Sequence, residues 1–394
     1  MMFQQRIHKA LEHRKALGLE RTVDISERES QAVMSRKAQR CINFSSNDYL
    51  GLAQDASLIQ AWQTGLDIYG CGSGASPMVT GYSPAHAKLE KQLCEWLGYP
   101  SAVLFNSGFS ANQALIFSLL EKGDAVFQDK LNHASLIEAG MLSPATMLRF
   151  KHNDLSDLSN KLQNGMKEQT NGQSTLVVTE GVFSMDGDRP DLKAMSELCK
   201  KNKAWFAVDD AHGFGVLGDT GQGSCHSAGI KPQILIVTFG KAAGISGAAI
   251  LCDHETANYL SQFARHFVYS TAMPPAQAHA LSHSISMIQT QFWRREKLAE
   301  LNAEYQHGLK HCLGYVETDT PIKPFICGDS QSAMSLSEAL KADGLWVSAI
   351  RPPTVPQNKA RLRITLSANH SLIQVKKLTS AISKNVMDFR NHEG

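Results

Sequence analysis

A lysine follows an apolar run in the stretch ILIVTFGKAAGISGAA, residues 234–249. The run Ile234–Val237 predicts a buried strand, and Lys241 comes next, between Gly240 and Ala242. A charged side chain is rarely buried without a partner, so the position needs an explanation. Because its small neighbours leave the amine accessible at the end of a buried strand, we expect its pKa to fall. Such a lysine becomes a nucleophile toward carbonyl groups; an ordinary surface lysine is the alternative.

Two further polar groups follow predicted strands. The segment VDDAH, residues 208–212, comes after the predicted strand Trp205–Val208. Neighbouring side chains in an extended chain point to opposite sides, so Asp209 and Asp210 cannot share one task. We interpret one of them as a buried carboxylate that holds a cation, with His212 beside it; a helix cap or a turn is the alternative. In DKLNHASL, residues 129–136, His133 also follows a strand, where a histidine is either catalytic or simply packed.

An anion site is predicted in NSGFSANQALI, residues 106–116. The segment combines a strand end, a glycine turn and a helix begun by Ser110, and helix N-termini attract anions. It lacks the full Walker pattern, so a small phosphate is enough. An amine, a carboxylate, a phosphate cradle and a ring to stack are what pyridoxal 5'-phosphate (PLP) requires. The carboxylate would keep the pyridine nitrogen protonated, and the lysine would hold the aldehyde.

Two glycine patterns imitate nucleotide sites but each lacks an essential part. The segment GFGVLG, residues 213–218, matches G-x-G-x-x-G, but the turn-rich DTGQGS that follows does not open a helix. Gly240 and Lys241 resemble a P-loop, yet Ala242 replaces the Ser or Thr that would hold magnesium. Leu235 stands where a P-loop has its first glycine. We therefore interpret neither pattern as a nucleotide site, and no metal ligand is assigned.

The elements that must position these residues alternate between about 100 and 250. Expected strands are Ala102–Phe105, Ala125–Gln128, Thr175–Thr179, Trp205–Val208, Ile234–Thr238 and Ala248–Cys252. Expected helices are Ser110–Leu120, Ser135–Leu142 and Leu192–Asn202. Continuous apolar strands alternating with helices are typical of a mainly parallel sheet covered on both faces. Active sites in such sheets lie at the carboxyl ends of the strands, where the polar residues above stand.

The pattern changes after Pro274 and Pro275. Residues 277–313 predict one long helix, followed by a strand near Phe325 and a helix over 332–342. Strands over 345–349 and 361–366 and a final helix from about Ser371 complete a small unit. We therefore predict an α/β protein with a large domain over residues 46–290 and a smaller α+β domain over 291–394. Residues 1–45 are expected to pack with the small domain, because they cannot bury a core alone.

Composition excludes several classes of protein. The chain has 394 residues, and 39 Lys and Arg against 37 Asp and Glu leave no basic excess that would indicate nucleic acid. No apolar stretch approaches the roughly 18 residues of a membrane span, and the first twenty residues lack the apolar core of a signal peptide. The eight cysteines are scattered without a C-x-x-C pair. Neither a zinc site nor a disulfide framework is expected, and a cytoplasmic location is the default.

Together these segments resemble the α-oxoamine synthases, a family of fold-type I PLP-dependent transferases. The segments that carry the resemblance run in family order over nearly the whole chain: FSSNDYLGL (44–52), GSGAS (72–76), SGFSAN (107–112), EGVFSMDGD (180–188), VDDAHGFGVLG (208–218), TFGKAAG (238–244), RPPTVP (351–356) and RLRIT (361–365). The resemblance implies a large domain with a mainly parallel sheet, a smaller α+β domain built from both termini, and a homodimer with active sites shared between subunits.

Within that family, FSSNDYLG (44–51), YSTAMPPAQA (269–278) and AIRPPTVP (349–356) are most similar to the 8-amino-7-oxononanoate synthases. These acyltransferases of biotin biosynthesis condense L-alanine with a pimeloyl thioester, carried by acyl carrier protein or coenzyme A, and release carbon dioxide. Other α-oxoamine synthases, of the 2-amino-3-ketobutyrate ligase, 5-aminolevulinate synthase or serine palmitoyltransferase type, are alternatives. So is an ordinary aminotransferase. A DNA-binding regulator with this fold is disfavoured, because no segment before Phe44 is long or basic enough.

The resemblance also implies roles for single residues. Lys241 would form the Schiff base, Asp209 would pair with the pyridinium nitrogen, and His212 would bond the ring hydroxyl. His133 would stack on the ring face. The phosphate would be held by the backbone of Gly108 and Phe109 and by Thr238, with Ser184 near the cofactor and Ser270 and Thr271 reaching the other subunit's phosphate.

The substrate positions follow from the same resemblance. Asn47 and Arg363 would take the alanine carboxylate, and Arg21 and Thr354 would contact the acyl substrate. One departure from the family lies beside the lysine. Relatives commonly have a glycine at position 242 and a larger residue at position 243, where this chain has two alanines. We expect looser packing and a loop that can move when the cofactor is absent.

Overall fold

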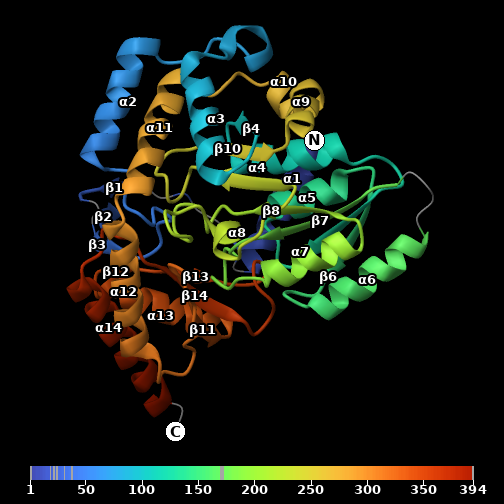
Figure 1. The fold of residues 1–394 in the computed structure, drawn as a ribbon. Coiled ribbons are helices and arrows are strands. Elements are labelled where there is room, and N and C mark those ends of the chain that lie inside the picture. The colour runs from blue at the N-terminus through green and yellow to red at the C-terminus, as the bar shows by residue number, and fades with distance from the viewer. Residues whose placement is uncertain are drawn as a thin grey trace.

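The computed structural model describes residues 2–17, 19–20, 23, 25–30, 32–36, 39–168 and 173–392. A seven-stranded sheet runs through its centre (Figure 1). Its strand order is β4 (Ser101–Phe105), β10 (Ala248–Cys252), β9 (Ile234–Thr238), β8 (Trp205–Asp209), β7 (Thr175–Glu180), β5 (Ala125–Asp129) and β6 (Thr146–Phe150). Only β10 is antiparallel to its neighbours. This confirms the predicted α/β class and all six predicted strands, whereas β6 was not predicted.

The apolar residues of each central strand divide between the two faces of this sheet. In β9, Ile234 and Ile236 belong to one buried cluster, and Leu235 and Val237 belong to the other. Successive side chains of a strand point to opposite faces, so a strand buried on both sides must be apolar throughout. That is why these segments read as continuous apolar runs rather than as alternating patterns.

Helices cover both faces. The face that carries Ile234 and Ile236 is covered by four helices: α4 (Gly108–Leu119), α5 (Ala134–Leu142), α9 (His254–Phe263) and α10 (Arg265–Val268). The face that carries Leu235 and Val237 is covered by five helices: α2 (Ala56–Tyr69), α3 (Pro84–Leu97), α6 (Leu155–Glu168), α7 (Leu192–Lys201) and α11 (Pro275–Thr290). A short π-helix η1 (Pro77–Gly81) and α8 (Ser224–Ser227) lie in the connections. Among the described residues, no helix is long and apolar enough to cross a membrane.

The C-terminal part lies below the large sheet in Figure 1, in orange and red. It contains α12 (Trp293–Leu309), β11 (Ile322–Gly328), α13 (Ser330–Ala342), β12 (Leu345–Trp346), β13 (Ser348–Ile350), β14 (Ala360–Thr365) and α14 (Leu372–His392). Strands β11, β14 and β13 form one sheet, in that order. A second sheet joins β1 (Ser26–Arg28), β2 (Val33–Arg36) and β3 (Gln39–Asn43) to β12. The early strands thus pair with the C-terminal part, whereas helix α1 (Met2–Ala16) has no buried residue.

Two sequence predictions about the C-terminal half are wrong. The single helix expected over 277–313 is two helices, because the backbone leaves the helical region at Gln291. The break lets the buried Arg294 bond Gln291, the Leu50 carbonyl and Asp55 at 2.6–2.8 Å. The strand expected over 345–349 is also divided: β12 pairs with β3, whereas β13 pairs with β14.

Candidate active site

A cavity of about 280 Å³ opens at the carboxyl ends of β5, β7, β8 and β9. Predicted site residues from widely separated segments line it: Asn47, Gly108, Phe109, His133, Asp209, His212, Thr238 and Lys241. The loops that follow parallel strands converge at the carboxyl-end edge of the sheet, so residues distant in sequence meet there. The structure therefore brings eight of the fourteen predicted residues into one cavity.

Lys241 follows β9 in a tight turn, in which the Gly244 N–H donates to the Lys241 carbonyl at 2.9 Å. Burial lowers the pKa of the Lys241 ammonium, and the nearby carboxylates of Asp209 and Glu180 oppose that shift. The guanidinium of Arg363 pushes the pKa in the same direction as burial. A larger share of neutral amine follows, which is the form that attacks carbonyls and accepts protons.

Asp209 ends β8 with its side chain in the cavity. One oxygen, Oδ2, accepts from Asn112 Nδ2 at 2.7 Å, and Oδ1 accepts from the Ala211 N–H at 3.1 Å. Glu180 lies directly opposite in β7, also faces the cavity, and its Oε1 has no hydrogen-bond partner among the described residues. Burial raises the pKa of Glu180 well above its usual value, and the Asp209 charge adds to the rise. Asp209 accepts two hydrogen bonds, whereas Glu180 Oε1 accepts none among the described residues, so Asp209 is the better-supported carboxylate for pairing with a cation.

The two histidines of the cavity are held in different ways. His133 caps α5, and its Nδ1 lies 2.8 Å from Ser135 Oγ. His212 has its Nδ1 2.6 Å from the hydroxyl of the buried Tyr49. Burial lowers the pKa of both imidazoles, that of His212 well below its usual value, and the Lys241 ammonium lowers both further. Both rings are therefore neutral near pH 7.

The start of α4 forms a cradle next to Thr238. A methyl group added at Gly108 would lie 2.6 Å from Thr238 Cγ2, so only glycine fits this contact. Thr238 Oγ1 is buried and has no hydrogen-bond partner among the described residues. An unpaired hydroxyl beside free N–H groups at a helix N-terminus suits a phosphate. The cradle, the carboxylate of Asp209 and the amine of Lys241 together fit PLP.

Arg363 of β14 is not among the residues that line the cavity, but it bonds to one of them. Its Nη2 donates to Asn47 Oδ1 at 3.0 Å, and its Nε donates to the Ser184 carbonyl at 2.6 Å. Arg363 is buried, and its partner Asn47 lines the cavity. Ser184 does not line the cavity; its backbone oxygen holds the arginine instead.

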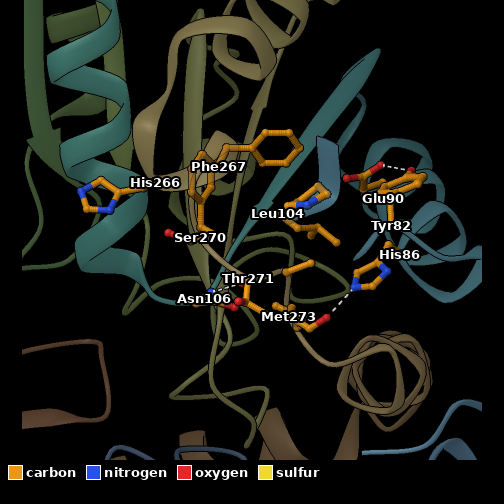
Figure 2. Close-up of a pocket in the computed structure, with 13 residues that line it drawn as sticks. Tyr82, His86, Glu90, Leu104, Asn106, His266, Phe267, Ser270, Thr271 and Met273 are labelled. Carbon is orange, nitrogen blue, oxygen red and sulfur yellow. Dashed lines mark hydrogen bonds between the residues drawn. The ribbon is translucent and has the colours of Figure 1, made fainter. Parts of the chain in front are cut away.

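The remaining predicted residues lie elsewhere. Ser270 and Thr271 line a neighbouring small cavity of about 20 Å³ (Figure 2), where the Thr271 carbonyl accepts from Asn106 Nδ2 at 2.9 Å. Asn106 lines both cavities. Thr354 is exposed and is not among the residues that line the main cavity, and Arg21 lies outside the described residues.

The sequence did not single out Asn112, Ser135 and Glu180, which line the cavity, or Tyr49, which bonds His212. Glu180 is the last residue of β7, so the strand-end rule that found Asp209 could have found it. Asn112 and Ser135 each lie one helical turn or less from a predicted residue. No sequence signal shows that they meet, because that contact depends on how α4 packs against α5.

The glycine pattern at 213–218 has a packing role. A methyl group on Gly213 would lie 2.2 Å from Asp210 Oδ1, and one on Gly215 would lie 2.7 Å from Ala242 Cβ. Ala242 and Ala243 are both fully buried in the core, and Ser284 Oγ donates to the Ala243 carbonyl at 2.8 Å. The small residues beside Lys241 are thus enclosed by neighbouring chain. Movement of this loop without cofactor stays a prediction.

Comparison with known proteins relates the whole chain to one family. The model of the family "Aminotransferase class I and II" matches residues 39–382. The 8-amino-7-oxononanoate synthase of Vibrio parahaemolyticus is 60% identical over 382 residues, which cover 97% of this chain and 98% of that protein.

Among the solved structures similar to the chain are two enzymes of this kind. The 8-amino-7-oxononanoate synthase of Francisella tularensis is 32% identical, covers 89% of this chain and 99% of its own, and gives a TM-score of 0.77. A serine palmitoyltransferase of S. paucimobilis, solved with PLP and myriocin, is 26% identical. The match covers 96% of this chain and 97% of that protein, with a TM-score of 0.88. The fold is therefore shared with enzymes of both names, whereas the 60% identity is to an 8-amino-7-oxononanoate synthase.

Proposed function

From the chain's place in the aminotransferase class I and II family, to which it belongs together with the 8-amino-7-oxononanoate synthases, we propose its reaction and its substrates. The protein is a PLP-dependent acyltransferase of biotin biosynthesis. It joins L-alanine to a pimeloyl thioester and yields 8-amino-7-oxononanoate, carbon dioxide and the free thiol of the carrier. The carrier is an acyl carrier protein or coenzyme A.

One observation carries the chemistry: the Lys241 amine shares a cavity with the hydrogen-bonded carboxylate of Asp209 and with the Thr238 hydroxyl. That hydroxyl lies beside the N-terminus of α4 and has no hydrogen-bond partner among the described residues. When bound, PLP supplies an aldehyde that captures the amino acid and a protonated ring that accepts electrons from its α-carbon. Lys241 would anchor the aldehyde, Asp209 would hold the proton on the ring nitrogen, and Thr238 with the start of α4 would hold the phosphate. His212 and His133 would contact the ring hydroxyl and the ring face.

The proton steps belong to the chain's own residues. Lys241 Nζ, when it is not bound to the cofactor, would accept the proton from the alanine α-carbon. Burial lowers the pKa of Lys241, which increases the share of the neutral amine that can accept this proton. Asn47 and Arg363 hold the alanine carboxylate, and the Ser184 carbonyl fixes the arginine. Arg21 and Thr354 are proposed to contact the acyl substrate.

The assembly is proposed to be a homodimer in the cytoplasm, with active sites shared between subunits. Ser270 and Thr271 would then reach the partner's phosphate. Their place in a separate cavity, beside Asn106 rather than beside Lys241 of the same chain, is consistent with this.

Two measurements test the function. Reduction of the holoprotein with borohydride should fix the cofactor on Lys241, identified by peptide mass, while Lys241→Ala should show neither the adduct nor turnover. Lys323→Met, which removes a buried lysine of β11 outside the cavity, is the control and should keep both. A Lys241→Ala protein with normal turnover would refute the proposal.

The substrates are tested by free-thiol release. Alanine, glycine and serine are each supplied with pimeloyl, acetyl, succinyl and palmitoyl thioesters. Alanine with the pimeloyl thioester should be the fastest pair by at least about tenfold, which corresponds to about 1.4 kcal/mol of transition-state discrimination. A preference for glycine or serine would assign another α-oxoamine synthase activity. Accumulation of the amine form of the cofactor without thiol release would indicate an aminotransferase.

A further inference from the structure

A continuous line of hydrogen bonds joins Asp209 to His133 inside the cavity wall. Asn112 Nδ2 lies 2.7 Å from Asp209 Oδ2 and 2.9 Å from Ser135 Oγ. Ser135 Oγ lies 2.8 Å from His133 Nδ1. Asn112 and Ser135 are almost completely buried, at 1% and 0% exposure, so water does not compete for these bonds.

The direction of each bond follows from counting hydrogens. The amide nitrogen of Asn112 has two hydrogens, and both are used, one toward Asp209 and one toward Ser135 Oγ. A reversed amide would place its oxygen against the Asp209 carboxylate, acceptor against acceptor, so this orientation is the favourable one. Ser135 Oγ accepts from Asn112, and its single hydrogen is therefore free to be donated to His133 Nδ1.

This fixes the state of the imidazole. Nδ1 of His133 receives the Ser135 hydroxyl and lies 3.3 Å from the Ser135 backbone N–H, so it is an acceptor. The neutral ring then carries its hydrogen on Nε2. Burial lowers the pKa of His133, and of the charged groups that act on it, Lys241 lowers the pKa further while Asp209 opposes the shift.

We infer that Asn112 and Ser135 are positioning residues that set the tautomer and tilt of His133 and tie them to the orientation of Asp209. The group proposed to hold the ring nitrogen and the group proposed to lie on the ring face are thereby held as one unit. The inference rests on the proposed cofactor site. It means that Asn112 and Ser135 help to orient the cofactor through Asp209 and His133, without having to touch it themselves.

The test compares Ser135→Ala, Asn112→Leu and the double variant with the wild type. Ser143→Ala is the matched control, because Ser143 lies at the other end of α5 and its hydroxyl donates to the Gly140 carbonyl at 2.9 Å. Three quantities are measured: the PLP dissociation constant of the apoprotein, the visible circular dichroism of the bound cofactor, and the thermal unfolding of the apoprotein.

Ser135→Ala should weaken PLP binding about five- to tenfold, the size of one hydrogen bond, and should reduce the cofactor's circular dichroism. Asn112→Leu should weaken binding at least as much. The double variant should be no worse than Asn112→Leu alone, because both substitutions break the same line. Ser143→Ala should match the wild type in binding and dichroism.

A direct readout is the imidazole itself. In ¹⁵N-histidine-labelled apoprotein, with His133 assigned by the loss of its signals in His133→Asn, the wild type should show the hydrogen on Nε2. Ser135→Ala should increase the share of the Nδ1-protonated form. This signal reports the tautomer and does not depend on activity or on cofactor.

The outcomes separate the two proposals. If the wild type binds PLP but Ser135→Ala equals Ser143→Ala in binding, dichroism and tautomer, the positioning role is wrong and the proposed function stands. Additive losses in the double variant would also overturn it. If the wild type does not bind PLP, the proposed function itself fails.

Discussion

Asp209 and Asp210 follow each other in the chain but lie on opposite sides of the end of β8. Asp209 faces the cavity and accepts from Asn112, whereas Asp210 is fully buried and accepts from the Ser224 N–H and Oγ at 2.6 and 2.5 Å. Glycines surround Asp210 so closely that a methyl group at 181, 213 or 223 would lie within 2.2 Å of its oxygens. Burial raises the pKa of Asp210 to about 7, with the Ser224 bonds opposing the rise. One carboxylate thus serves the site and the other anchors the loop that follows.

Amide substitutions of these two aspartates should have different effects. Asp209→Asn should lower turnover by about 100- to 1000-fold, since losing one preorganised charge interaction costs about 3–4 kcal/mol, while apoprotein stability changes little. Asp210→Asn should keep the cofactor spectrum and most of the turnover but lose about 1–3 kcal/mol of unfolding free energy. Steady-state thiol release and urea unfolding of both variants check this. An Asp209→Asn enzyme with wild-type kinetics would contradict the pyridinium role.

Gly108→Ala should weaken PLP binding, because the added methyl would lie 2.6 Å from Thr238 Cγ2 and must displace one wall of the cradle. We expect a loss of at least about tenfold, in line with the 1–3 kcal/mol cost of overpacking. Thr238→Ser removes the methyl group in question and keeps the hydroxyl. The pair Gly108→Ala with Thr238→Ser should therefore bind PLP more tightly than Gly108→Ala alone. Fluorescence titration of the apoproteins with PLP measures the affinities. If the double variant binds PLP no more tightly than Gly108→Ala, the contact with the Thr238 methyl group is not the cause of the loss.

His152 should make stability depend on pH. Its Nδ1 lies 3.0 Å from Asp129 Oδ1 and its Nε2 lies 2.7 Å from Asp188 Oδ2. Burial acts to lower the pKa of His152, but the two aspartates raise it to about 9. The unfolded value is about 6.5, so the folded state holds this proton more tightly. The stabilisation is complete below about pH 6.5 and is lost as the pH rises through about 9.

His152→Gln should therefore be less stable than the wild type by about 2 kcal/mol near pH 6, and the difference should shrink toward pH 10. Urea unfolding of the apoprotein across this range measures the difference. His226→Gln is the control, because His226 and Asp219 form an exposed pair at 3.5 Å, which contributes little. A constant difference between His152→Gln and wild type at all pH values would refute the role of this charge.

Lys323 should produce the opposite slope. It is buried in β11, and its Nζ donates to the Thr318 carbonyl at 2.6 Å and to Thr318 Oγ1 at 3.0 Å. Burial lowers the pKa of Lys323 to about 7, with Asp319 and Glu317 opposing the shift. The unfolded lysine keeps its proton to about pH 10.4, so stability rises with pH between about 7 and 10.

Lys323→Met should lack that rise. It should be more stable than the wild type below about pH 7, by about 2–4 kcal/mol, and the advantage should fall as the pH increases. Chemical unfolding at several pH values measures this. Identical pH slopes in the two proteins would show that the lysine is not desolvated in the folded state.

The strands and the polar residues at their ends could be predicted from sequence because both follow local rules, whereas positions such as Asn47 and Thr238 came from the family resemblance. Doubly buried strands must be apolar, and a polar residue such as Lys241 or Asp209 just beyond one stands out. The break at Gln291 could not be predicted, because the helical pattern continues across it and the bonds of Arg294 that accompany it join distant parts of the chain. The bonds of Asn112 and Ser135 were missed for the same reason: they depend on tertiary packing between α4 and α5. The roles of single site residues remain predictions for the experiments above.

Arg363 belongs to β14 in the C-terminal part, whereas Lys241, Asp209 and Thr238 stand on the large sheet. Its side chain is held in place by the Ser184 carbonyl and by Asn47. The group proposed to hold the amino-acid carboxylate therefore stands on a different part of the fold from the groups proposed to hold the cofactor. Substitutions along β14 that move the Arg363 side chain should therefore weaken amino-acid binding more than cofactor binding. The architecture divides the two binding tasks between separate parts of the fold, so amino-acid affinity can be tuned from β14.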